Sequence, residues 1–72
     1  METEKVKQLI ENGLPGAIVE VTGDGRHFEA VVTHADFAGK PLLQQHRMVK
    51  ETVKEQLASD ELHALSIKTK VE

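Results

Sequence analysis

Residues 17–33, with the sequence AIVEVTGDGRHFEAVVT, decide the fold because two apolar runs flank a glycine-rich turn. The first run, residues 17–22, is rich in β-branched side chains and predicts a strand. The second run, residues 27–33, alternates Phe, Ala and Val with more polar side chains, which predicts a strand with one buried face. Glycine and aspartate form the short connection, so the two strands are expected to pair as an antiparallel hairpin.

The segments at the two ends of the chain predict one helix and one more strand. Residues 2–11 place Val6, Leu9 and Ile10 on one helical face, and the Asn-Gly pair that follows ends this helix. Residues 63–69 predict the last strand, in which Leu65 and Ile67 share the apolar face.

A long helix is predicted to begin at Pro41, whose missing N–H is not needed in the first helical turn. Residues 35–40 before it are expected to be irregular, and residues 58–61 after it predict a short turn or small helix. An apolar stripe at helical spacing marks the face that packs on the sheet. It consists of Leu42, His46, Val49, Val53 and Leu57, widened by Leu43.

The predicted order is therefore α-β-β-α-(short α)-β, an α+β fold with helices on one face of a three-stranded sheet. The 72 residues suffice for a single domain, spanning residues 1–72. With two Phe and no Trp or Tyr, the core must be mainly aliphatic.

Composition excludes several classes of function. No stretch approaches the roughly 20 apolar residues of a membrane span, and the charged N-terminus lacks the apolar core of a signal peptide. We therefore expect a cytoplasmic chain with no membrane partner. The net charge of −3 is a poor basis for general nucleic-acid binding.

The sequence gives little support to enzyme activity. Ser59 and Ser66 have no base in a recognisable setting, and the chain has no Cys to act as a nucleophile. The Gly-Asp-Gly turn joins two strands and lacks the pattern of a phosphate-binding loop. The chain is expected not to be an enzyme.

The four histidines differ in their predicted environments. His27 and His63 each open a strand, where binding residues are often found, although position alone slightly favours a structural role for both. His46 lies on the apolar stripe and is expected to be packed or partly buried. His34 lies on the opposite strand face from His27 and is expected to be a solvated surface residue.

Residues 37–70, FAGKPLLQQHRMVKETVKEQLASDELHALSIKTK, resemble the core of the BolA family. The matching features are a Phe-x-Gly stretch, a helix with Leu, His-Arg and Val, and His-Ala-Leu on the last strand. The GDGRHF turn resembles the loop of the IbaG-like branch of that family. The resemblance implies a KH-like fold of the second type (type II), with the α-β-β-α-α-β order.

The resemblance also implies a function. BolA-like proteins pair with monothiol glutaredoxins of the CGFS type. The pair either shares a 2Fe–2S cluster with the glutaredoxin cysteine and glutathione, in cluster assembly, trafficking or iron regulation, or forms a complex without a cluster, in which the chain is a purely structural adaptor. The family's histidine ligand corresponds to His63, and the second, loop ligand corresponds to His27. No cofactor is expected in the isolated chain, since a chain without Cys cannot hold such a cluster conventionally.

The alternative function is nucleic-acid binding and transcriptional control through the helix-turn-helix-like region. The basic residues that would contact a partner or nucleic acid are Lys40, His46, Arg47, Lys50 and Lys54. Glu51 and Glu55 interrupt this set, and Arg47 and Glu51 have the spacing of a helical ion pair. The sequence leaves DNA and a homodimer open as further partners.

Overall fold

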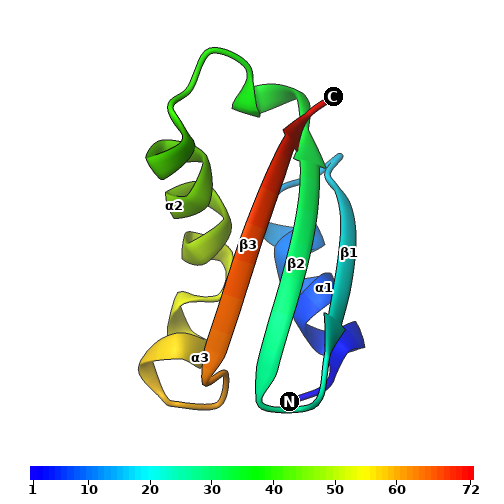
Figure 1. Cartoon of the computed structure of the whole chain (residues 1–72), viewed down its shortest axis with the longest axis vertical. Helices are drawn as coiled ribbons and strands as arrows, with labels where there is room; N and C mark the ends of the chain where they lie inside the picture. The colour runs from blue at the N-terminus through cyan, green and yellow to red at the C-terminus, as the bar shows by residue number, and fades with distance from the viewer.

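The computed structural model describes residues 1–72, and its helices lie on one face of a three-stranded sheet (Figure 1). The elements are α1 (Thr3–Gly13), β1 (Ile18–Gly23), β2 (His27–His34), the 3-10 helix η1 (Ala35–Phe37), α2 (Leu42–Thr52), α3 (Lys54–Ala58) and β3 (Ala64–Val71). α1 lies behind β1 and β2, whereas α2 and α3 follow the β3 side (Figure 1). The predicted α+β class and element order are confirmed. No helix has both the length and the apolar character needed to cross a bilayer.

The sheet has the order β1-β2-β3 and combines both kinds of strand pairing. β1 and β2 form the predicted antiparallel hairpin, with Ile18 opposite Thr33 and Gly23 opposite Phe28. β2 and β3 are parallel. Parallel neighbours cannot be joined by a tight turn, so η1, α2 and α3 carry the chain back along the sheet before β3 begins.

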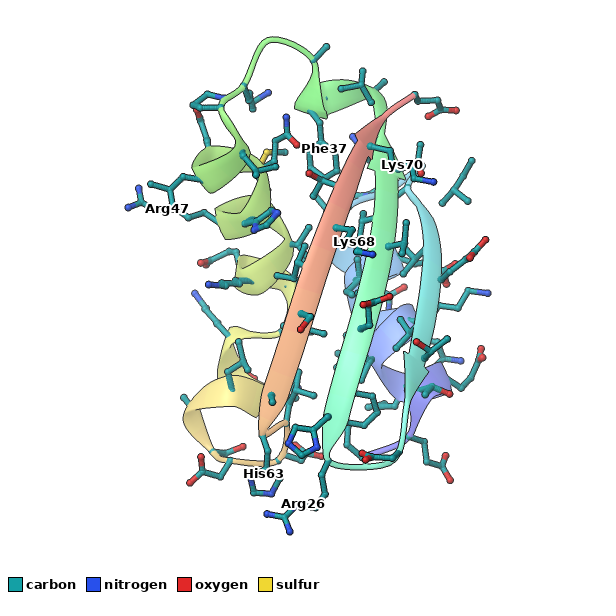
Figure 2. All side chains as sticks on the ribbon, viewed as in Figure 1. Arg26, Phe37, Arg47, His63, Lys68 and Lys70 are labelled. Carbon is teal, nitrogen blue, oxygen red and sulfur yellow. The ribbon has the colours of Figure 1, made fainter.

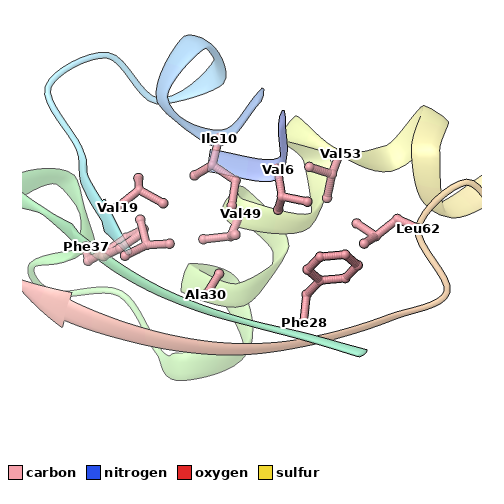
Figure 3. Packing of buried hydrophobic residues seen from close by; sticks show 10 residues of the cluster. Val6, Ile10, Val19, Phe28, Ala30, Phe37, Val49, Val53 and Leu62 are labelled. Carbon is pink, nitrogen blue, oxygen red and sulfur yellow. The ribbon is translucent and has the colours of Figure 1, made fainter. Parts of the chain in front are cut away.

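The core forms between the covered face of the sheet and the helices (Figure 3). Residues Phe28, Ala30 and Val32 of β2 are buried, as the alternation in the sequence predicts. Helix α1 contributes Val6 and Ile10 to the same cluster. The other buried residues of the core cluster are Val19, Phe37, Val49, Val53 and Leu62.

Gly13 allows α1 and α2 to approach closely. A Cβ atom at this position would lie 2.4 Å from Cγ2 of Thr52, well inside van der Waals contact. The sequence predicts Gly13 as the residue that ends the first helix, and the structure adds this packing requirement.

The predicted long helix is wrong in length, because it is divided at Val53. This residue leaves the helical region, with φ −124° and ψ 20°, and the separate helix α3 follows. Val49 and Val53 are buried as expected. Leu42 and Leu43 are 62% and 65% exposed, so the predicted apolar stripe fails at its first turn. Helix α2 and strand β3 diverge toward this end of the helix, which leaves the first turn little to pack against (Figure 1).

The expectation that His34 is a solvated surface residue is also wrong. Strand β2 extends through His34, and the two-residue period places this side chain on the buried face, where it is 8% exposed. Its Nε2 lies 3.0 Å from the carbonyl oxygen of Pro15, and its Nδ1 accepts a hydrogen bond from the N–H of Asp36 at 3.0 Å. These partners fix a neutral imidazole with its proton on Nε2. Its ring also contacts Phe37, with 5.8 Å between ring centroids.

We expect His34→Ala to lower the free energy of unfolding by about 1–3 kcal/mol, because it leaves polar backbone groups without their partner. Urea unfolding followed by far-ultraviolet circular dichroism measures this loss. The exposed His63→Ala variant is the control and should stay within about 0.5 kcal/mol of the parent chain. Equal losses in the two variants would show that the His34 contacts contribute nothing to stability.

Candidate functional site

The parallel register brings the two predicted ligand histidines to the same edge of the sheet. Its first pair aligns His27 of β2 with Ala64 of β3, and His63 directly precedes Ala64. The side chain of His63 lies beyond the start of β3, at the same end of the molecule as Arg26 (Figure 2). Both histidines are exposed, so a partner molecule can reach their imidazole rings.

An aspartate-centred turn positions His27. Oδ1 of Asp24 accepts hydrogen bonds from the N–H groups of Arg26 and His27, both at 2.9 Å. Oδ2 of the same carboxylate lies 3.7 Å from Nδ1 of His27. Gly25 has a φ of +98°, which a side chain would disfavour. The backbone N–H groups of His27 and Arg26 hold the pKa of Asp24 below its ordinary value of 3.8.

The residue before His63 is anchored in the core. Leu62 is 1% exposed, and its N–H donates to the carbonyl oxygen of Gln56 at 2.9 Å. Asp60, within the same connection, has a φ of 62° and lets the chain reverse after α3. His63 therefore projects from a fixed point at the start of β3.

The nitrogen ligands that this edge offers a metal are two imidazoles, those of His27 and His63. The chain has no Cys, and no group of three or more His, Cys, Asp or Glu side chains could hold a metal ion. Such a donor set fits a contribution of nitrogen ligands to a shared metal centre, with the remaining ligands supplied by a second molecule.

The basic residues proposed for partner binding lie elsewhere, on α2 and its flanks. Arg47 and Lys50 are exposed, and Arg47 points away from the sheet (Figure 2). His46 is half-buried, as its place on the stripe predicts. Lys40 is tied to the backbone, because its Nζ donates to the carbonyl oxygen of Asp36.

The expected ion pair between Arg47 and Glu51 is wrong. Oε1 of Glu51 instead accepts from Nζ of Lys54 at 2.7 Å. This hydrogen bond and the charge of Glu51 raise the pKa of Lys54. Lys54 is thus less available to an anionic partner than the sequence alone suggests.

Sequence reasoning missed the structural role of Gln45. Its Nε2 donates to the carbonyl oxygens of Phe37 at 3.2 Å and Lys40 at 2.8 Å, and its Oε1 accepts from Oγ1 of Thr69. The side chain therefore holds the connection before α2 and links that helix to β3. In the sequence, only one feature indicates this role: Gln45 precedes the buried Val49 by one helical turn and so lies on the same face of the helix.

No histidine lines a hollow of the surface. A depression of about 260 Å³ lies between α1, the end of α2 and the start of α3, and a second one of about 320 Å³ lies between the end of α1 and α2. Residues that line them include Leu9, Leu14, Met48 and Thr52, and no histidine is among the lining residues.

Comparison with known proteins identifies the family. The model of the BolA-like protein family matches residues 6–72. The chain belongs to the BolA family. A solved structure described as a bolA protein homologue from Coxiella burnetii is similar to this BolA-like chain at a TM-score of 0.89 and 43% identity, covering 99% of this chain and 91% of that one.

Two further relatives extend the comparison. The acid stress protein IbaG of Escherichia coli is 31% identical over 68 residues, which cover 94% of this BolA-like chain and 81% of the relative. The BolA domain of SufE1 from Arabidopsis thaliana has a TM-score of 0.80 at 27% identity, covering 96% of this chain and 90% of that one. The resemblance read from residues 37–70 is confirmed, and with it the fold of this family.

The Asp24 turn predicts a local transition in acid. The folded state lowers the pKa of Asp24, so the ionised carboxylate holds the turn in place above pH 3.8. This stabilisation of the turn is lost as the pH falls through the pKa of Asp24 in the folded chain. Amide nuclear magnetic resonance shifts of Arg26 and His27 should therefore move with a midpoint below 3.8. The Asp24→Ala variant should lack this transition. A midpoint at or above 3.8 in the parent chain would contradict the assigned hydrogen bonds.

Proposed function

We propose that this BolA-like chain binds a monothiol CGFS glutaredoxin and supplies His63 and His27 as ligands to a 2Fe–2S cluster at their interface. The glutaredoxin cysteine and glutathione supply the sulfur ligands, as the family resemblance implies. The role is that of a non-catalytic partner in iron–sulfur cluster assembly, trafficking or iron regulation. The single observation that carries the proposal is the parallel register, which aligns His27 with the residue after His63.

The chemistry of the two side chains supports this function. Neutral imidazole nitrogens replace thiolates on one iron in Rieske-type centres, where they raise the reduction potential. Both histidines are exposed, and the chain has no thiol of its own. The cluster supplies one-electron redox and transfer chemistry when it is bound, whereas this chain holds two nitrogen donors at the edge of a rigid sheet.

Nucleic-acid binding through α2 has weaker physical support. Lys54 is paired with Glu51, and Lys40 is bonded to the backbone. Only Arg47 and Lys50 remain as exposed cations without a partner on this helix, in a chain whose net charge is −3. Phosphate binding that relies on released counterions needs a larger basic cluster.

We expect His63→Ala to abolish or shift the visible absorption and circular dichroism of the cluster formed with the glutaredoxin and glutathione under anaerobic conditions. His27→Ala should have a milder effect, since the family resemblance makes His63 the main ligand and the loop residue the second one. Acid should weaken the loaded complex, because a ligating imidazole must be neutral.

The control is Glu20→Ala, which changes an exposed side chain of β1 and should leave the cluster spectrum unchanged. Far-ultraviolet circular dichroism establishes that each variant stays folded. A cluster spectrum that is identical in the His63→Ala and Glu20→Ala complexes would overturn the proposed ligand. A chain that forms no complex with the glutaredoxin would overturn the proposed partner.

A further inference from the structure

The carboxylate of Asp24 faces His27 in a fixed orientation. Its Oδ1 is held by the N–H groups of Arg26 and His27, each at 2.9 Å, so the group cannot rotate freely. Its Oδ2 is thereby directed toward the imidazole ring, 3.7 Å from Nδ1. The N–H of Asp24 donates to the carbonyl oxygen of His27 at 3.2 Å, which closes the turn on the same two residues.

The chemistry of the carboxylate selects one form of the ring. An ionised carboxylate only accepts hydrogen bonds, so Nδ1 of His27 gains a partner only when it carries the proton. The side chain is 76% exposed and can turn to shorten the contact. In that neutral form Nε2 has a free lone pair, on the side of the ring away from Nδ1 and Asp24.

We propose that Asp24 is a positioning residue that holds His27 as its Nδ1–H tautomer and so presents Nε2 as the metal ligand. The assignment of a metal to Nε2 rests on the function proposed above, whereas the tautomer is a property of the free chain. Carboxylates that orient a ligating histidine in this way commonly change metal affinity 10–100-fold when they are removed.

The chain contains its own reference for the opposite tautomer. His34 uses Nδ1 as an acceptor for the N–H of Asp36 and has its proton on Nε2, toward Pro15. Asp36 also has a carboxylate oxygen 3.8 Å from the ring, but the backbone contacts set the tautomer there. The two histidines should therefore give opposite patterns in one spectrum.

The test of the tautomer needs no metal. Long-range ¹H–¹⁵N spectra of the free chain, recorded about two pH units above the ordinary histidine pKa of about 6.5, distinguish the two neutral forms. We expect mainly Nδ1–H for His27 and Nε2–H for His34. Asp24→Asn keeps an oxygen for the two backbone N–H groups but places an amide NH₂ toward the ring, so His27 should change to Nε2–H.

Asp36→Asn is the matched control and should leave both histidines unchanged. An Nε2–H pattern for His27 in the parent chain, or the same pattern in the parent and in Asp24→Asn, would overturn the proposed role of Asp24. This result does not depend on whether a cluster binds.

The second measurement uses the complex with the glutaredoxin, glutathione and a cluster. We expect Asp24→Asn to release the cluster about 10-fold faster than Asp36→Asn, in line with the effect of orienting carboxylates at other metal sites. Equal release rates, with the expected tautomers in the free chain, would show that Nε2 of His27 is not a ligand. Absence of any cluster in the parent complex would overturn the proposed function and leave the tautomer result standing.

Discussion

Parallel pairing between β2 and β3 is the constraint on which the rest of the structure depends. It obliges the chain to cross from the end of one strand to the start of the next, and η1, α2 and α3 are that crossing. The crossing helices also close the core over Phe28 and Ala30. The same pairing makes β2 and β3 start at the same edge of the sheet. His27, which opens β2, and His63, which precedes β3, therefore become neighbours although they lie far apart in the sequence.

Local patterns predict most of the elements but not their limits. The alternation in residues 27–33 correctly identifies the buried face of β2, because a strand has only two faces. The same alternation, extended by one residue, places His34 on the buried face. Sequence analysis instead predicts an exposed side chain, because a polar residue at the end of a strand is usually solvated. The division of the long helix at Val53 has no glycine or proline to mark it, and the exposure of Leu42 and Leu43 follows from the divergence of α2 and β3 at that end (Figure 1).

The site is less accessible to sequence reasoning than the fold. Spacing along the chain gives no reason to join His27 with His63, since only the strand order and the parallel register bring them together. The family resemblance names both residues without needing that geometry. Asp24 is recognisable as a turn former, whereas the second oxygen of its carboxylate acquires a direction only once both backbone N–H groups are bonded to the first.

The register between β2 and β3 also sets the order in which the molecule can assemble. The hairpin joins neighbouring segments and closes a short loop, but the pairing of His27 with Ala64 must join positions separated by about half of the chain. Contacts of such separation carry a larger entropy of loop closure and slow the folding of small domains. The two histidines thus become neighbours only when the last strand docks, so a nascent or partly folded chain does not bring both imidazoles to one end of the sheet.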